Sequence, residues 1–185
     1  MSVPKSKRNL SQLEFYHTAF TLRKNLTELL LKDFSIKDKV RDIRSYVSTN
    51  RFEQADKEMF LQLCEKYKIN EKIVEQYPEW LISHFRMNIL NTLNDLINNI
   101  TYANSVYPTR EAEYDERRAF QNKAIANCYQ LLQEMQYVIS VVPVNAEKYM
   151  QHVDLIEKEI ALLKGWRKSD NRILKAIKNK SGQPL

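Results

Sequence analysis

Glycine is almost absent from this chain, and its scarcity limits the folds that the chain can adopt. The 185 residues contain two glycines, Gly165 and Gly182, so the first 164 positions have none. Tight hairpin turns, phosphate-binding loops and dinucleotide-binding fingerprints use glycine for positive φ angles or for close backbone approach. The sequence therefore favours an all-α fold and argues against P-loop or Rossmann chemistry.

Three interior prolines divide the chain into helical segments. Pro78, Pro108 and Pro143 would each cost a helix interior a hydrogen bond. Apolar residues between and around them recur at intervals of three and four, as on one face of a helix. Four long amphipathic helices with short connections predict an antiparallel four-helix bundle over residues 11–168, with a helical insertion at about 35–77.

Local signals place the ends of these helices. Ser11 with Glu14 reads as a capping box for the first helix, and Thr109 and Asn145 are the expected N-caps of the third and fourth. In the insertion, two short apolar rows suggest two further helices. These rows are Ile36, Val40, Ile43 and Val47, and then Met59, Leu63 and Tyr67.

The third helix carries a strict heptad row in which two positions are polar. The row reads Tyr114, Arg117, Gln121, Ala124, Cys128, Leu131, Met135, Val138 and Val142. Arg117 can pair with an acid of a neighbouring helix at the bundle end. Alternatively, Arg117, Arg118 and Gln121 form a polar surface that docks a partner or an RNA phosphate. The row of the fourth helix reads Tyr149, Val153, Ile156, Ile160 and Leu163.

The positive charge of the chain lies at its two ends. The net charge is +6, of which residues 1–8 carry +3 and residues 164–180 carry +6, so the stretch between them carries the balance of −3. We expect a basic N-terminal arm at 1–10 and a basic C-terminal tail at 169–185. A solvated tail is one interpretation, and a polyanion-binding stripe is the other. The candidate nucleic-acid contacts are Lys5, Lys7, Arg8, Lys164, Arg167, Lys168, Arg172, Lys175 and Lys178.

The junction within this basic segment has its own expectations. Gly165 either ends a helix in the αL conformation or marks a close helix approach, and Trp166 follows the apolar row into the core. Ser169 or Asp170 can then cap a short basic amphipathic helix. Its apolar residues, free to meet a partner, are Ile173, Leu174 and Ile177.

No catalytic, metal-binding or cofactor-binding pattern stands out. His17, His84 and His152 have no second ligand at helical spacing, and Cys64 and Cys128 read as reduced core cysteines. No run of apolar residues is long enough for a membrane span. We therefore expect a cytoplasmic protein that is not an enzyme, has no cofactor and does not contact a membrane.

Several segments together resemble a known family of four-helix-bundle proteins. They are "NSVYP", "YDERRAFQNKAIANCYQLL", "LLKGWRKSDNR" and the opening "SVPKSKR". The family includes the accessory variability determinants of diversity-generating retroelements and the proteins encoded in 23S ribosomal RNA intervening sequences. The likeness covers residues 1–34 and 78–172.

This resemblance implies a non-enzymatic protein that binds template RNA and a reverse transcriptase and supports mutagenic complementary DNA synthesis. It also implies a homo-oligomer, of the pentameric kind, with basic surfaces. The contact positions it suggests are Arg117, Arg118, Lys164, Arg167 and Lys168. The compact relatives lack the insertion at 35–77, which could block or rebuild an oligomer interface. The alternative function is a helical protein–protein adaptor that binds no nucleic acid.

Overall fold

The computed structural model describes residues 13–32, 39–49, 52–69, 72–75 and 77–181. The predicted N-terminal arm, with Lys5, Lys7 and Arg8, lies outside these residues, as does the predicted Ser11 cap. Among the described residues helices predominate, which agrees with the expectation from the scarcity of glycine.

Contacts along the backbone divide the chain into two compact units. One unit combines Met1–Ile36 with Ser83–Leu185, and the other is Lys37–Ile82. The first unit therefore contains the segments before and after the insertion predicted from the sequence.

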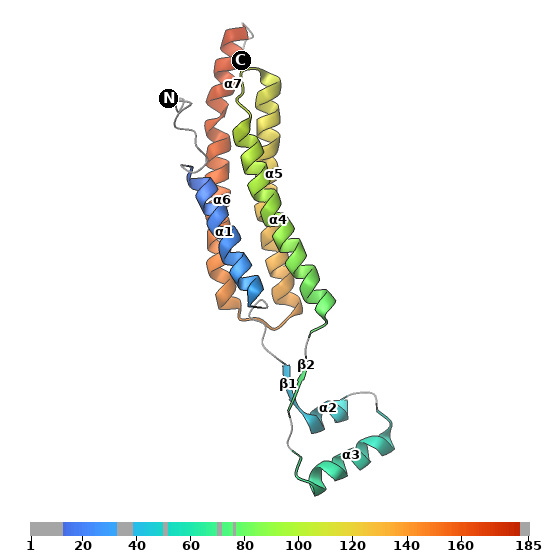
Figure 1. The fold of residues 1–185 in the computed structure, drawn as a ribbon. Coiled ribbons are helices and arrows are strands. Elements are labelled where there is room, and N and C mark those ends of the chain that lie inside the picture. Colours follow the sequence, from blue (N-terminus) through green and yellow to red (C-terminus); the bar gives the residue numbers. More distant parts are fainter. Residues whose placement is uncertain (1–12, 33–38, 50–51, 70–71, 76, 182–185) are drawn as a thin grey trace. The chain divides into compact units, whose positions relative to one another are not determined.

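The first unit is a bundle of long helices lying side by side (Figure 1). The helices are α1 (Glu14–Leu31), α4 (Glu79–Ser105), α5 (Glu111–Val141) and α6 (Ala146–Ser169), and α7 (Asn171–Ser181) follows α6. Short connections at 106–110 and 142–145 join α4 to α5 and α5 to α6. No helix in the described part of the chain has the length and apolar character needed to cross a bilayer.

The bundle core consists of the apolar stripes that the periodicity predicts. Every member of the α5 row from Tyr114 to Val142 is buried, including Arg117 and Gln121. The α1 and α4 stripes are also buried, from Phe15 to Leu29 and from Phe85 to Ala103. Cys64 and Cys128 are buried free cysteines, as expected.

The helix starts agree with the sequence in one case and differ in two. Asn145 caps α6 by accepting a hydrogen bond from the Glu147 backbone N–H. The N-cap of α1 is Leu13, which makes no side-chain cap bond, so the first described helix begins later than a Ser11 cap would place it. At α5 the N-cap is Arg110 rather than Thr109.

Glu113 organises the start of α5. Its Oε2 accepts hydrogen bonds from the Thr109 backbone N–H and hydroxyl, both at 2.7 Å, and Arg110 donates to Oε1 at 2.8 Å. These bonds, Thr109 contributing most, lower the pKa of Glu113 to about 2. Thr109 therefore supports the helix start through the Glu113 side chain instead of capping it directly.

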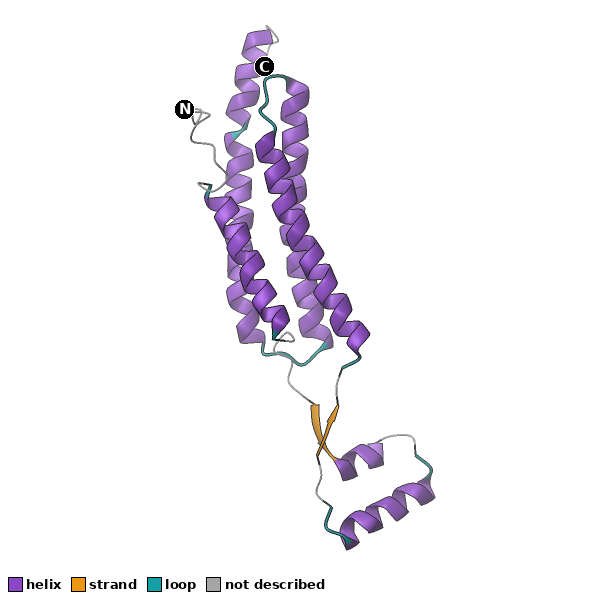
Figure 2. Cartoon of the chain, viewed as in Figure 1, coloured by secondary structure: helices purple, strands orange, loops and turns teal. Residues whose placement is uncertain are grey.

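The second unit corrects the expectation of a purely helical insertion. Strand β1 (Lys39–Asp42) pairs antiparallel with β2 (Lys72–Glu75), so that Lys39 lies opposite Glu75 (Figure 2). Between them lie α2 (Ile43–Thr49) and α3 (Gln54–Lys66). The helix predicted from the row Ile36, Val40, Ile43 and Val47 is confirmed at Ile43 and Val47, which lie in α2, and is wrong at Val40, which lies in β1. Ile36 is outside the described residues. The predicted helix at Met59 and Leu63 is confirmed as α3.

Gly165 has neither of the two roles that the sequence suggested. It lies inside α6, four residues before the helix ends, and its φ is not in the positive region. A Cβ built at this position would meet nothing within 4 Å, so no neighbouring helix needs a glycine there.

We therefore expect Gly165→Ala to raise the free energy of unfolding by about 0.5–1 kcal/mol, because alanine restricts the unfolded chain and favours helix. Chemical denaturation followed by circular dichroism measures the change. The matched control is Ala161→Gly, one turn earlier on the exposed side of α6, which should lower stability by a similar amount. A loss of stability in Gly165→Ala would contradict the open environment.

Candidate nucleic-acid interface

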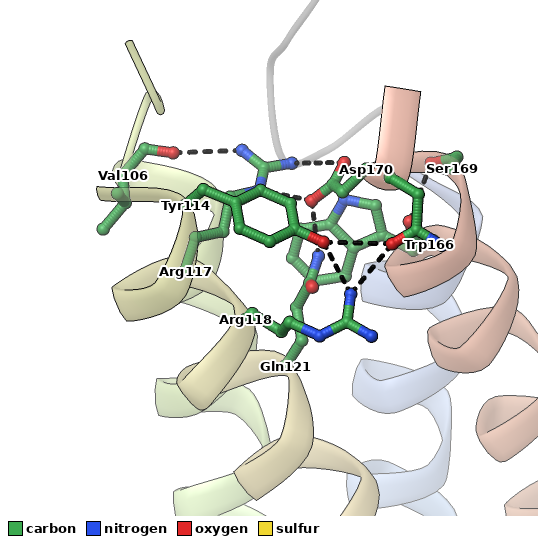
Figure 3. Close-up of polar contacts among 9 residues, drawn as sticks. Val106, Tyr114, Arg117, Arg118, Gln121, Trp166, Ser169 and Asp170 are labelled. Carbon is green, nitrogen blue, oxygen red and sulfur yellow. Dashed lines mark hydrogen bonds and ion pairs between the residues drawn. The ribbon is translucent and has the colours of Figure 1, made fainter. Parts of the chain in front are cut away.

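A buried ion pair joins α5 to the end of α6. Arg117 Nε donates to Asp170 Oδ2 at 2.7 Å, and its Nη2 lies 3.4 Å from Oδ1. Gln121 Nε2 donates to the same Oδ2 at 2.8 Å, and Arg117 Nη1 donates to the Val106 carbonyl at 3.0 Å. Figure 3 shows the Arg117 guanidinium between this carbonyl and the carboxylate. The prediction that Arg117 pairs with an acid of a neighbouring helix is confirmed.

Trp166 packs against this network and against α1. Its ring stacks on Phe15 of α1, with centroids 4.2 Å apart and planes 12° apart, and the Arg117 guanidinium carbon lies 5.2 Å from the ring centroid. Trp166 therefore packs inside the bundle end, as its place after the apolar row predicts. Because its face is already covered, it does not offer a free platform for a nucleic-acid base.

A second set of polar contacts joins α5 to the start of α7. Tyr114 Oη donates to Asn171 Oδ1 at 3.0 Å, and Arg118 Nη1 donates to both oxygens at 2.7 and 3.0 Å. The Tyr114 ring is buried, whereas Arg118 is half-buried. This set fixes the first turn of α7 against α5.

Three basic side chains bridge α5 to α6 and α7 through neutral partners. Lys164 donates to Tyr129 Oη at 2.7 Å, Arg167 donates to Asn122 Oδ1 at 2.7 Å, and Arg118 reaches Asn171. We name Arg118, Lys164 and Arg167 the cationic stripe. Since Asn171, Tyr129 and Asn122 are uncharged, these contacts hold the basic side chains in place without cancelling their charge.

The two helical stretches that carry the cationic stripe contain one acidic residue. Residues 117–133 of α5 include no Asp or Glu, and residues 160–181 of α6 and α7 include Asp170 alone. Asp170 is buried and bound to Arg117, so it adds no negative charge to the surface. The exposed charge over both stretches is therefore positive.

The remaining predicted contacts differ in their surroundings. Lys168, Arg172 and Lys175 are exposed and extend the positive charge along α6 and α7. Lys178 instead pairs with Glu111 at 3.6 Å, so a carboxylate offsets its charge. Arg117 and Gln121 are buried, with their donors directed at Asp170 and the Val106 carbonyl. Arg118 is therefore the accessible member of the predicted partner-binding set.

The predicted amphipathic helix after Asp170 is present as α7, which packs against α5 and α6. Its apolar residues Ile173, Leu174 and Ile177 are half-buried in these contacts. They are consequently less available to a partner than the sequence suggested.

The sequence did not reveal a buried carboxyl in the middle of the bundle. Glu159 of α6 is 0% exposed, and neither of its carboxyl oxygens has a hydrogen-bond partner. Burial raises its pKa to about 8, and burial together with the nearby Glu159 raises the pKa of the Cys128 thiol. His152, two turns earlier, is also buried, and burial lowers its pKa.

Within the part of the chain that the structure describes, no three His, Cys, Asp or Glu side chains gather as metal ligands would. Glu159 and Cys128 are a pair without a third ligand. The cationic stripe, in contrast, combines anchored cations with helical stretches, 117–133 and 160–181, that carry no exposed acid. In comparisons with known proteins, no family model, curated protein or solved structure matches the chain.

Proposed function

We propose that this protein binds RNA through the cationic stripe and acts as a non-enzymatic accessory subunit of a reverse transcriptase of the diversity-generating retroelement type. The observation that carries RNA binding is that Arg118, Lys164 and Arg167 are held by neutral side chains. Held cations with uncompensated charge bind phosphates at a low cost in side-chain entropy. The role beside a polymerase rests on the sequence resemblance.

The same resemblance supports a finer description of the fold. We propose that α1, α4, α5 and α6 form the antiparallel four-helix bundle of that family, with the segment at about 35–77 as its insertion. The protein is then a homo-oligomer, of the pentameric kind or a variant of it rebuilt around the insertion. Sedimentation of the purified protein measures the stoichiometry directly.

The stripe predicts a salt-dependent affinity. Replacing Arg118, Lys164 and Arg167 with glutamine should weaken binding to single-stranded RNA and flatten the dependence of log K on log salt by about 2, since each lost phosphate contact removes about 0.7 from the slope. Fluorescence anisotropy with a labelled oligonucleotide at several salt concentrations measures both quantities.

A matched control separates the stripe from net charge. Lys24, Arg110 and Lys158 each pair with a carboxylate in the bundle unit. Replacing these three with glutamine removes the same charge and should leave the slope near its original value. Equal losses in both triple variants would attribute binding to overall charge, and unchanged binding in the stripe variant would place the RNA site on another surface. A protein that binds no RNA at any salt concentration would favour the protein adaptor.

Point substitutions test the stripe better than removal of residues 164–185. That truncation also removes Trp166 and Asp170, which pack and pair inside the bundle end. The polymerase part of the proposal has a separate test, namely co-purification with the product of an adjacent reverse transcriptase gene. A gene neighbourhood without a reverse transcriptase and near-identical repeats would contradict that part alone.

A further inference from the structure

An apolar stripe lies exposed along α3, in the unit formed by Lys37–Ile82. Its large side chains are 42–63% exposed. They are Phe52, Met59, Leu63 and Tyr67. Met59, Leu63 and the C-cap Tyr67 follow one another at intervals of four and share one face of α3, whereas Phe52 precedes the extended N-cap Glu53 and lies outside the helix. A contiguous apolar surface of this kind indicates a binding site.

The side chains that the structure describes in this unit include few buried apolar ones. Among its described side chains, the buried apolar ones are Val47 and Cys64. Cys64 is fully buried, and its backbone carbonyl accepts a hydrogen bond from Arg44 Nη2 of α2 at 3.3 Å. Since a unit of this size rarely gains enough stability from its own core, association that covers the stripe would supply the missing burial.

The heptad positions on the stripe suggest what covers it. Leu63 and Asp56 occupy a positions, and Met59 and Lys66 occupy d positions. In an antiparallel pair of identical helices, a positions of one copy pack beside d positions of the other. A twofold axis at position 61 then sets Met59 beside Leu63 of the second copy.

The same axis sets Asp56 beside Lys66 of the second copy, and it does so twice, once at each end of the pair. The acidic and basic positions are thus complementary to their own image, with two apolar layers between two layers of opposite charge. A parallel pair would instead place Asp56 beside Asp56.

We propose that α3 is a self-association surface that pairs antiparallel with α3 of a second copy of this chain. The inference does not depend on RNA binding, which concerns the other unit. One helix pair buries less area than a standard interface, so the dimer forms in the micromolar range of concentration.

Sedimentation velocity of the full-length protein tests the pairing by charge reversal. Asp56→Lys sets lysine beside Lys66 in both outer layers and should weaken self-association by at least about tenfold. The double variant Asp56→Lys with Lys66→Asp restores opposite charges only if the partner is a second copy, and should return the affinity to within about threefold. Circular dichroism checks that both variants keep their helical content.

Leu63→Glu is a second probe, because it places a carboxylate in each apolar layer, and it should abolish the pairing. A chain that sediments as a monomer up to about 100 μM would overturn the proposal. So would a double charge variant that associates no better than Asp56→Lys, since another occupant of the stripe would not be rescued. Self-association that none of the variants changes would place the contact between copies on a different surface.

Discussion

Asp170→Ala should lower the free energy of unfolding by about 3–5 kcal/mol, which is the typical effect of leaving one member of a buried ion pair without its partner. Asp170 and Arg117 have side chains that are 6% and 11% exposed, so water cannot replace the lost carboxylate. The variant also leaves the Gln121 amide without its acceptor, although Gln121 Oε1 already has no hydrogen-bond partner. Urea denaturation at pH 7 followed by circular dichroism measures the loss.

Two controls distinguish this explanation from a general weakness of the bundle end. Glu28→Ala breaks an exposed ion pair with Lys24 and should change stability by less than about 0.5 kcal/mol. The double variant Asp170→Ala with Arg117→Met removes the stranded charge, and it should recover part of the loss. If Asp170→Ala were as mild as Glu28→Ala, the buried pair would not hold the bundle end together.

The buried face of α5 could be predicted because residues were assigned to it by their spacing alone, whether they were apolar or polar. Strict alternation of three and four gave a row from Tyr114 to Val142 that is buried throughout, although Arg117 and Gln121 belong to it. Helical geometry decides which positions face inward, and a polar residue there is buried if a partner satisfies it. Asp170 is that partner for both.

The α6 row was only partly predicted, because apolar residues were preferred over strict spacing. Val153 was placed in the row, but it is half-buried, whereas His152 and Glu159 are buried. The strict alternation reads Tyr149, His152, Ile156, Glu159, Leu163, Trp166 and Asp170. Starting from the Arg117–Asp170 pair, the α5 row read toward its C-terminus and the α6 row read toward its N-terminus have the same spacing. This spacing places Cys128 of α5 beside Glu159 of α6.

Other features depend on contacts between distant residues and could not be predicted from local sequence patterns. The β1–β2 ribbon pairs segments some 30 residues apart in the sequence. In so short a segment, the apolar spacing around Val40 and Ile43 cannot be distinguished from that of a helix. The basic residues of the cationic stripe were predicted, but their neutral partners were not. Tyr129 and Asn122 lie 35 and 45 residues from the cations they bind, and no helical spacing connects such pairs.

Glu159 should make the protein less stable as pH rises from about 4.5 to about 8. Its pKa is about 8 in the fold against an ordinary value of 4.5, so over this range the unfolded chain has released the proton that the folded chain still holds. The stability contributed by the neutral carboxyl is therefore complete below pH 4.5 and declines by up to about 1.4 kcal/mol per pH unit. The full loss is roughly 4–5 kcal/mol at pH 8 and above.

Glu159→Gln cannot ionise, so the stability it gains over the original chain should grow across the same pH range. Urea denaturation at half-unit steps from pH 5 to pH 9 measures this difference, and Glu157→Gln, an exposed site on the same helix, should show none. His152 acts in the opposite direction: burial lowers its pKa, so its contribution is lost as pH falls below about 6.5. Because His152 is the same in both chains, it cancels in the comparison. A pH-independent gain in Glu159→Gln would contradict the prediction, because it would mean that the carboxyl is ionised inside the bundle, with the nearby Lys158 offsetting the cost of burial.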